Sequence, residues 1–265
     1  MVELLLILSG LVYVSFLGAV LYGMIALKRN TSNEPGTSDK FVSVIVPARN
    51  EEAGIVDCLR SIVSGSLEQS MFEVIVVDDH STDETGSLVE QFIVDHPNTR
   101  LVQLVGADTG KSAALNAGIS ISRGDLIATI DADCIASKSW LKSTSELISE
   151  SSPIVSGAVF FKPGGGLFSS MQALEFLGLV AVGAGCIGVG YPTICNSANL
   201  TYRKSLVSTL AQNGFAVDAA ADEKMLQQMN SQGIGSAAFN IDRDSFVTAE
   251  PVSSLRDFFE QRRRW

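Results

Sequence analysis

The sequence predicts an α/β fold, in which a Rossmann-like, mostly parallel sheet is flanked by helices and preceded by a transmembrane helix. Two observations support this. A long uncharged stretch opens the chain, and short β-branched runs then alternate with stretches of helical character. Strands that alternate with helices form a parallel sheet covered on both faces. The four clearest strand candidates are FVSVIVP (41–47), FEVIVVDD (72–79), RLVQLV (100–105) and DLIATIDAD (125–133).

The N-terminal stretch is long enough to cross a membrane. From Leu4 to Leu27 roughly 24 residues carry no charge, and as a helix they would span about 36 Å against about 30 Å of hydrocarbon. Lys28 and Arg29 follow directly, and the positive-inside rule then places the remaining chain in the cytoplasm. We therefore expect residues 1–29 to be a retained anchor in the cell (inner or plasma) membrane. A cleavable signal peptide is the alternative.

Composition limits the function of the remaining chain. Residues 30–40 are polar and rich in helix breakers, so they predict a linker, and residues 41–265 follow as the globular domain. A formal charge of −10 argues against nucleic acid as a partner, because such binders need basic side chains to displace counterions from phosphates. Two histidines and no CxxC spacing leave little support for zinc, and the four cysteines are interpreted as reduced, buried thiols.

Polar clusters follow three of the four predicted strands: PARNEE at 47–52, DDHSTD at 78–83 and DADC at 131–134. Ligands of open parallel sheets bind outside the carboxyl ends of the strands. The three clusters are therefore expected to converge on one edge of the sheet.

Asp131 and Asp133 form the most informative pair in these clusters. If the strand runs through them, residues two apart point to the same side, and like charges that close raise one pKa unless a cation intervenes. Ligands that are all oxygen favour Mg²⁺ or Mn²⁺, which usually bind a substrate's phosphates as well. The sequence therefore predicts a metal-bound phosphate ester as ligand.

Two similar patterns carry less weight. IDRD at 241–244 also has two aspartates two apart, but it follows no long apolar run and is interpreted as a solvated turn. GADTGKS at 106–112 has three residues between its glycines where a phosphate-binding P-loop needs four. ATP hydrolysis therefore loses its main support.

Six motifs together resemble a known family. They are VSVIVPARNEE, VVDDHSTDET, GKSAALNAGI, DADC, ADEKML and the terminal QRRRW, and they occur in the order and approximate spacing of family 2 glycosyltransferases, which have the GT-A fold. The resemblance covers residues 41–265 and is greatest for the membrane-bound branch of hyaluronan synthases, cellulose synthases and ceramide glucosyltransferases. It implies a nucleotide-sugar half at 41–135 and an acceptor half at 136–265.

The resemblance also implies an activity and a donor site. Family members transfer a sugar from a nucleotide diphosphate, usually UDP, to an acceptor hydroxyl with inversion at the anomeric carbon. By position in the motifs, Ala48 and Glu51 would contact the base and ribose, and Asp79 would bind the uracil. Glu51 has a purely structural alternative, stabilising the N-terminus of the following helix through its dipole.

The same comparison assigns roles around the diphosphate. Lys111 would approach the donor from the N-terminal turn of a helix, where free backbone N–H groups also favour anions, although a solvated surface lysine is the alternative. Asp131 resembles the residue that touches the ribose or donor sugar and lies beside the metal, and Asp133 resembles the direct metal ligand. The cofactor implied is Mn²⁺ or Mg²⁺.

An inverting displacement needs a general base, which the family supplies from a motif such as GDDxxL. AADEKML matches that form with Asp222 at the first acid and Glu223 at the second, so Glu223 is the expected base. Glutamate reaches one methylene further than the usual aspartate. Asp222 as the base and a solvated helix start therefore remain alternatives.

The C-terminal LRDFFEQRRRW supports two compatible interpretations. Its apolar residues fall on one side of a helix, as in an amphipathic segment lying on a membrane. In the family interpretation Gln261, Arg264 and Trp265 match QxxRW, which closes over the diphosphate beside the acceptor channel. An arginine that pairs with phosphate oxygens suits this role. Members of that branch usually continue into further transmembrane helices, so we expect the chain to be part of a longer protein.

Residues 176–195 are uncharged and long enough for a second span. A span there would place Glu223 and the QRRRW motif across the membrane from Asp133, so we expect a glycine-rich segment facing the membrane on the acceptor side. This predicts a lipid or glycan acceptor, lipid-linked or emerging at the membrane. Two other functions remain open: a nucleotidyltransferase using the same edge, and a non-catalytic membrane component that binds nucleotide sugar or a partner.

Overall fold

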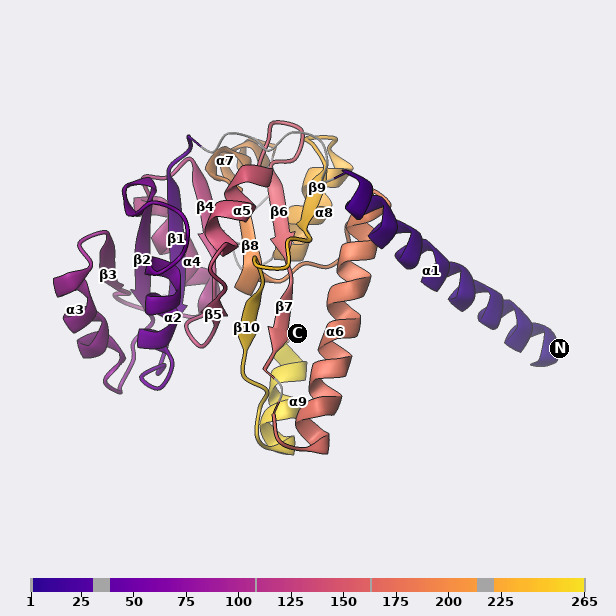
Figure 1. Ribbon diagram of the computed structural model, residues 1–265, viewed down its shortest axis with the longest axis horizontal. Coiled ribbons are helices and arrows are strands. Elements are labelled where there is room, and N and C mark those ends of the chain that lie inside the picture. The colour runs from indigo at the N-terminus through magenta and orange to yellow at the C-terminus, as the bar shows by residue number, and fades with distance from the viewer. Residues whose placement is uncertain (1, 31–38, 108, 163, 214–221, 265) are drawn as a thin grey trace.

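The computed structural model describes residues 2–30, 39–107, 109–162, 164–213 and 222–264. Its centre is a seven-stranded sheet with the order β3-β2-β1-β4-β8-β6-β9 (Figure 1). The neighbours β3, β2, β1 and β4 are parallel, β8 runs antiparallel to β4 and β6, and β9 pairs parallel with β6. The mostly parallel α/β sheet predicted from the sequence is confirmed. The strands are β1 (Val42–Ala48), β2 (Phe72–Asp78), β3 (Thr99–Gln103), β4 (Leu126–Thr129), β6 (Ile154–Gly157), β8 (Leu200–Arg203) and β9 (Ala237–Asn240).

Side chains of the central strands alternate between two apolar clusters because successive residues of a strand point to opposite faces. Val44 of β1 packs on the face covered by α2 (Ile55–Val63) and α3 (Thr85–Asp95). Ile45 packs on the other face, against α4 (Lys111–Ile121), α7 (Lys204–Gln212) and α8 (Asp222–Ser231). Both valine and isoleucine are fully buried, which explains why β1 is apolar along nearly its whole length.

A second, smaller sheet stands beside the central one. Its order is β5-β10-β7, from Ile135–Ala136, Val247–Ala249 and Val159–Phe161. The remaining described helices are α1 (Val2–Asn30), α5 (Trp140–Leu147), α6 (Leu167–Gly188) and α9 (Leu255–Arg264), with short 3-10 turns at Gln69–Met71 and Ser197–Asn199. In Figure 1, α6 runs alongside the small sheet, and α9 lies below the sheet beside the lower end of α6. Arg262 of α9 joins them through an ion pair with Glu175 of α6.

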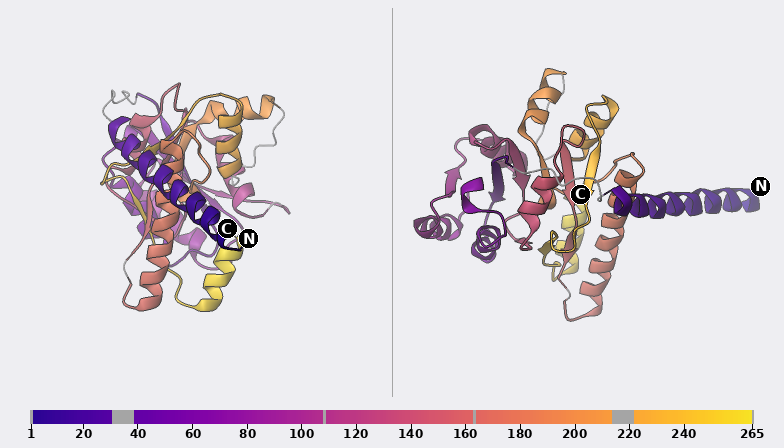
Figure 2. Two further views of the ribbon diagram at one scale, coloured as in Figure 1. Left: turned by 90° about the vertical axis from the view of Figure 1, so that its right-hand side faces the viewer. Right: turned by 45° about the horizontal axis from the view of Figure 1, so that its top comes forward.

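The N-terminal helix α1 projects away from the domain, and its C-terminal end is the part that packs on it (Figures 1 and 2). Leu5, Tyr13 and Leu21 are about three-fifths exposed, whereas Val20 and Leu27 are buried against α6. The helix is apolar and long enough to cross a membrane over Val2–Lys28. Residues 31–38 of the predicted linker lie outside the described residues.

The glycine-rich segment predicted at 176–195 is mostly helical, because α6 continues to Gly188. Its glycines allow a close approach of backbones: a Cβ on Gly185 would lie 2.6 Å from the Val20 carbonyl oxygen. The length and composition of α6 also suit a membrane span, but part of the helix is buried in the domain. Its glycines therefore serve packing rather than weakening the helix.

The strand expected over 125–133 is shorter than predicted. β4 ends at Thr129, and Asp131 and Asp133 lie in the following turn, in which the Cys134 N–H donates to the Asp131 carbonyl at 3.1 Å. The alternation of a strand therefore does not explain why the two carboxylates are close. The turn brings them together instead.

Candidate functional site

The loops after β1 and β2 are fastened to each other at the carboxyl edge of the sheet. Asn50 and His80 both adopt a positive φ, of 56° and 57°. The Asn50 N–H donates to Ser81 at 3.0 Å, and the Glu51 N–H donates to the Thr85 hydroxyl at 2.8 Å. Asn50 in turn accepts the Thr82 N–H at 2.8 Å. These bonds hold the two predicted polar clusters together as one surface.

Asp79 lies at the base of this surface and is buried. Its carboxylate accepts the Gly110 N–H at 2.7 Å, lies 3.0 Å from His80 Nδ1, and pairs with Arg49 at 3.4 Å. Burial acts to raise the pKa of Asp79, but the bonds from His80 and Gly110 and the charge of Arg49 outweigh it and lower the pKa. Asp79 is therefore an ionised acceptor that links the β2 loop to the start of α4.

Lys111 begins α4 directly after Gly110, whose φ of 95° favours glycine. Its ammonium group lies 2.6 Å from Asp131 Oδ1 and donates to the Ser197 hydroxyl at 2.7 Å. Ser197 is fixed in turn, because its carbonyl accepts the Thr129 hydroxyl at 2.6 Å. Lys111 therefore joins the helix start to the acidic turn and to the segment before β8.

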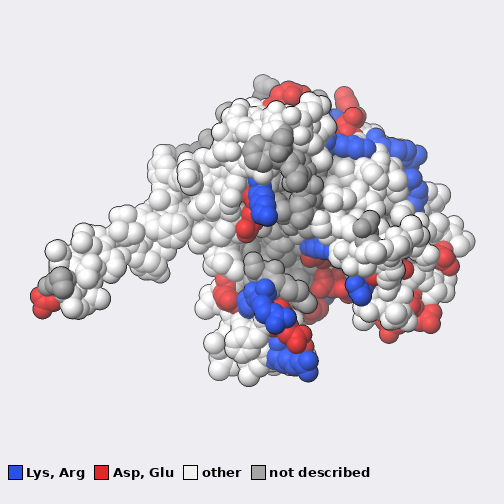
Figure 3. Space-filling view, turned by 180° about the vertical axis from the view of Figure 1, so that it is seen from behind, with Lys and Arg blue, Asp and Glu red and all other residues white. Residues whose placement is uncertain are grey.

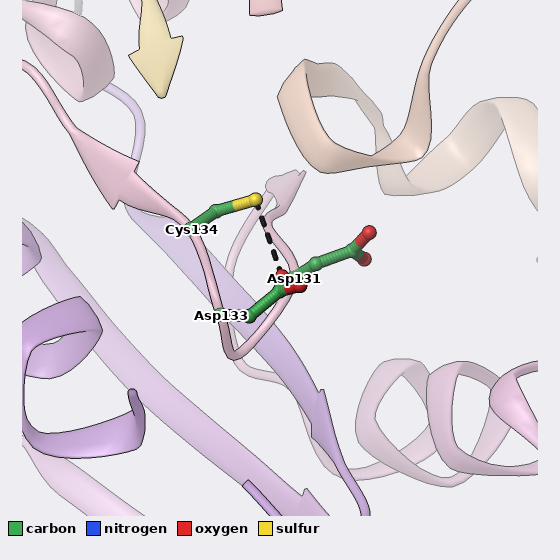
Figure 4. Close-up of side chains that lie close together, drawn as sticks. All are labelled: Asp131, Asp133 and Cys134. Carbon is green, nitrogen blue, oxygen red and sulfur yellow. Dashed lines mark hydrogen bonds between the residues drawn. The ribbon is translucent and has the colours of Figure 1, made fainter. Parts of the chain in front are cut away.

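The acidic turn after β4 holds Asp131, Asp133 and Cys134 in one small group (Figure 4). One potential ligand atom from each lies within 4.8 Å of the others. The buried Cys134 thiol donates to Asp133 Oδ1 at 3.4 Å, and burial followed by the charge of Asp133 raises the pKa of this thiol. Cys134 therefore stays protonated, and the two carboxylates are the available anionic ligands of the group.

Negative charge at the turn exceeds the positive charge beside it. Desolvation, followed by the Asp131 carboxylate, raises the pKa of Asp133. Desolvation and then the charges of Asp133 and Asp131 raise the pKa of Glu51 to about 7. A cation bound here would relieve this repulsion, and the carboxylate donors suit Mg²⁺ or Mn²⁺. Acidic side chains gather in the hollow seen from behind in Figure 3.

The remaining predicted residues are placed less completely. Glu223 is exposed in the first turn of α8, whose Met225 and Leu226 are buried in the same cluster as Leu115 of α4. Ala48 is buried at the end of β1. The side chains of Asp222 and Arg264, and all of Trp265, lie outside the described residues.

The C-terminal helix is connected to α6 instead of to the edge of the sheet. The Gln261 side-chain oxygen accepts a hydrogen bond from the Arg262 guanidinium at 2.7 Å. Arg262 also stacks over Phe258, with its Cζ 4.3 Å from the ring centroid. Within the described part of the chain, no hydrogen bond or ion pair joins Gln261 or Glu223 to Asp79, Asp131 or Asp133. The roles of these residues stay predictions.

Arg49, Gly110 and Ser197 belong to the site but were not singled out from the sequence. Arg49 lies in the PARNEE cluster, and Gly110 begins the GKSAALNAGI motif. Their positions in these motifs could have indicated that both belong to the site. No local pattern indicated that Ser197 would contact Lys111. It reaches Lys111 because β8 pairs with β4, and that pairing joins residues far apart in the chain.

The sequence profile of glycosyl transferase family 2 matches residues 43–226 of this chain. The chain belongs to this family. The matched range contains the three polar clusters, Lys111 and both acids of the ADEKML motif. The chain is therefore a family 2 glycosyltransferase, as its motifs predicted.

Three curated family relatives illustrate the range of similarity. The chain is 35% identical over 144 residues to "Glycosyltransferase AglE" of Haloferax volcanii, which covers 51% of this chain and 47% of the relative. It is 32% identical over 109 residues to "Beta-monoglucosyldiacylglycerol synthase" of Trichormus variabilis, covering 41% and 23%. It is 37% identical over 94 residues to "Undecaprenyl-phosphate 4-deoxy-4-formamido-L-arabinose transferase" of Pseudomonas aeruginosa, covering 35% and 28%. The chain thus spans about half or less of the length of these relatives.

Solved glycosyltransferases share the fold of this family member. The mannosyltransferase PcManGT from Pyrobaculum calidifontis, in complex with GDP-Man and Mn²⁺, superposes with a TM-score of 0.68 at 24% identity, covering 94% of this chain and 69% of that one. Residues 1–349 of S. aureus TarS, in complex with UDP-GlcNAc, give 0.56 at 23% identity, covering 81% and 59%. The GT-A architecture predicted for the domain is confirmed.

Proposed function

We propose that this protein transfers a sugar, with inversion, from a UDP-sugar to a hydroxyl of a lipid-linked or polysaccharide acceptor at the cytosolic face of a membrane. One observation carries the proposal. In a family 2 chain, Asp131 and Asp133 lie in the turn after β4, Asp131 pairs with Lys111, and Asp79 accepts the N–H of the neighbouring Gly110. This is the edge where an open parallel sheet binds nucleotide ligands.

The donor would lie across the loops after β1 and β2. Ala48 and Glu51 would border the base and ribose, and Asp79 would accept the imide N–H of uracil. Asp79 suits this role because it stays ionised, and a carboxylate retains acceptor capacity beyond the bonds it already makes. The two solved relatives contain GDP-Man and UDP-GlcNAc, so the choice of UDP rests on the resemblance to the membrane-bound branch.

A divalent cation, Mn²⁺ or Mg²⁺, would be held by Asp133 with Asp131 beside it. Such an ion would neutralise the charge that develops on the departing diphosphate. Lys111 already compensates Asp131 at 2.6 Å and would add positive charge on the phosphate side. The excess of carboxylates over cations around Asp133 supports this placement.

Glu223 would accept the proton of the acceptor hydroxyl, with Asp222 as the alternative base. The exposed Glu223 carboxylate, at the start of a helix anchored on the same face as α4, supports this assignment. Residues 136–265 would form the acceptor half, in which Gln261, Arg264 and Trp265 close over the diphosphate. A base that accepts this proton accelerates the transfer step and does not need to bind the donor.

The acceptor side is proposed to face a membrane. The names of two relatives refer to diacylglycerol and undecaprenyl phosphate, both of them lipids. α1 exposes a long row of leucine and other apolar side chains, a surface that is unfavourable in water and matches a bilayer. Residues 1–29 would anchor the enzyme, 30–40 would link it, and the catalytic domain would lie in the cytoplasm.

The test replaces the acid that would bind the metal. With Mn²⁺ and a panel of UDP-sugars, the wild-type chain is expected to release UDP, whereas Asp133→Asn should lose UDP release and Mn²⁺-dependent UDP binding. Asp244→Asn is the matched control, because Asp244 belongs to the other aspartate pair and is exposed in a turn. Equal activity of Asp133→Asn and wild type would remove the metal assignment.

The products also separate the alternative functions. Release of pyrophosphate in place of UDP would identify a nucleotidyltransferase. Binding of UDP-sugars by the wild-type chain without any turnover, with every acceptor lipid tried, would favour the non-catalytic membrane component.

A further inference from the structure

An apolar cavity lies where the anchor helix meets the catalytic domain. Its volume is about 360 Å³, and its walls come from α1, α6, β7, β9 and the loop after β9. In Figure 1 these elements meet on the side of the molecule from which α1 projects. The residues that carry the argument are Met24, Leu27, Phe160, Leu177, Ala181 and Phe246.

The lining suits a hydrocarbon guest. α1 contributes Met24 and Leu27, and the Phe160 and Phe246 rings lie 5.7 Å apart on the domain side. Apolar cavities tend to exclude water and accept apolar guests. The cavity therefore favours hydrocarbon over water. None of its lining residues belongs to the acidic turn after β4.

The cavity is a fixed feature because α1 and α6 cross at glycines. A Cβ on Gly23 would lie 2.0 Å from the Gly185 carbonyl oxygen, so the two backbones are in direct contact. Small residues allow such close approach of apolar helices. Met24 and Leu27 follow this crossing on α1, so both lie at the wall of the cavity, where Leu27 is buried and Met24 is 42% exposed.

The exposed apolar surface of α1 leads into the cavity. Leu17 and Leu21 are 44% and 60% exposed, and Met24 and Leu27 follow them on the same helix. On α6, Leu174 is 72% exposed and Leu177, a cavity residue, follows one turn later. If α1 spans a bilayer, the cavity opens at the end of the span nearest the domain.

We propose that this cavity binds an acyl chain of a bilayer glycerolipid. Acyl chains would surround α1 along its span, and the cavity continues the same apolar surface into the domain. Asp242 and Arg243 on the polar side of the cavity supply one charge of each sign, which suits a zwitterionic headgroup. The inference rests on the proposed membrane anchoring by α1, not on the identity of the donor or acceptor.

A tryptophan probe tests the inference directly. Full-length Phe160→Trp is placed in vesicles of phosphatidylcholine that carries bromine at the middle of its acyl chains and contains no glycosyl acceptor. Bromine quenches a tryptophan that it touches, so most of the added fluorescence should be lost relative to unbrominated vesicles. Val94→Trp is the control, because Val94 is 80% exposed on α3, far from α1 (Figure 1), and should not be quenched.

Filling the cavity should reverse the effect. Ala181→Phe, added to the Phe160→Trp chain, places a ring in the cavity and should restore the fluorescence. Leu174→Phe adds a ring on the same helix outside the cavity and should leave the quenching unchanged. Phe246→Trp provides a second probe on the same cavity if Phe160→Trp does not fold.

Three results would overturn the proposal: equal signals from the probes at 160 and 94, quenching that survives Ala181→Phe, or a probe at 160 shielded because a second copy of the chain fills the cavity. UDP release measured on the same vesicles reports the proposed catalysis separately. Failure of the chain to stay with the vesicles would instead reject the anchoring on which the inference rests.

Discussion

At the scale of single residues, Asp79 and Asp133 show that different surroundings shift the pKa of the same carboxyl group in opposite directions. Asp79 is surrounded by donors, and its pKa is lowered despite burial. Asp133 has Asp131 nearby and the thiol of Cys134 as a weak donor, and its pKa is raised. The first carboxylate is compensated by the protein itself. The second is left for a ligand to compensate, which supports its assignment to the metal.

The assignment of the base is open to a direct comparison of two variants. Glu223→Gln is expected to lower kcat by about 10²- to 10⁴-fold, the usual contribution of a positioned base. UDP binding should be unchanged, because the base acts on the acceptor. Titration with UDP and single-turnover transfer, measured on the same samples, separate the two effects.

Asp222→Asn is the matched comparison, since it removes the neighbouring acid of the same motif. If Asp222→Asn loses turnover and Glu223→Gln keeps it, the roles are reversed. If both variants remain fully active, the ADEKML motif does not supply the base.

At the scale of elements, one buried acid ties the first three strands together. Glu73 of β2 is fully buried and accepts the Ser43 hydroxyl of β1 at 2.7 Å. Arg100 of β3 and Arg123, which precedes β4, both pair with it, at 2.7 and 3.1 Å. Desolvation acts to raise the pKa of Glu73, but these bonds and charges together lower it. The cluster therefore fastens the sheet at the edge remote from the site.

Glu73→Gln should lower the free energy of unfolding at neutral pH by about 2 kcal/mol, below the usual loss for a broken buried pair because both arginines are partly exposed. The pKa of Glu73 is lower in the folded state than the ordinary 4.5, so its contribution is complete above that pH and is lost as the pH falls below it. The difference in unfolding free energy between Glu73→Gln and the wild type should therefore become smaller at acidic pH.

Chemical denaturation at several pH values measures this difference. Glu90→Gln, which alters an exposed glutamate on α3, is the control and should be neutral. A difference that is constant from neutral to acidic pH would show that the ionised form of Glu73 contributes nothing.

The crossing of α1 and α6 is a second test at this scale. Gly23→Leu puts side-chain atoms where the Gly185 backbone already lies, so α1 must shift or leave the domain. We expect the unfolding free energy in detergent to fall by about 1–3 kcal/mol, as for other overpacked sites. Gly18→Leu is the matched control on the same helix, because no atom lies within 4 Å of its added Cβ. Equal thermal stability of the two variants would show that the crossing is not rigid.

At the scale of the whole molecule, the orientation across the membrane can be measured. The proposed anchor and the positive charges after it predict that the catalytic domain lies in the cytoplasm. Val94→Cys introduces an exposed thiol on α3. A membrane-impermeant maleimide should label it in inside-out vesicles and leave it unlabelled in right-side-out vesicles.

The native chain is the baseline, since Cys58, Cys134 and Cys186 are buried and Cys195 is half-buried. Labelling in right-side-out vesicles would place the domain outside the cell. Loss of the protein from the membrane fraction would favour the cleaved signal peptide.

Local patterns were sufficient to predict the parallel half of the central sheet, β1 to β4, and the edge of that half where the candidate site lies. Short apolar runs alternating with helices indicated β1 to β4, and the polar residues at their carboxyl ends indicated the edge where Asp131 pairs with Lys111 and Asp79 accepts the Gly110 N–H. These inferences succeeded because parallel strands bring their ends to one edge, whatever the details of the loops. The length of β4 was overestimated because an apolar run does not reveal where a turn begins.

The sequence by itself determined the family, the α/β fold and the apolar N-terminal helix, and it indicated the acids proposed for the site, because each is encoded in a few neighbouring residues. The tertiary structure decided what depends on contacts between distant segments. Ser197 reaches Lys111 through the antiparallel pairing of β8 with β4, and α6 becomes a packed helix because its glycines meet Gly23 of α1. Such contacts have no local signature, since they form only when separate parts of the chain share one surface.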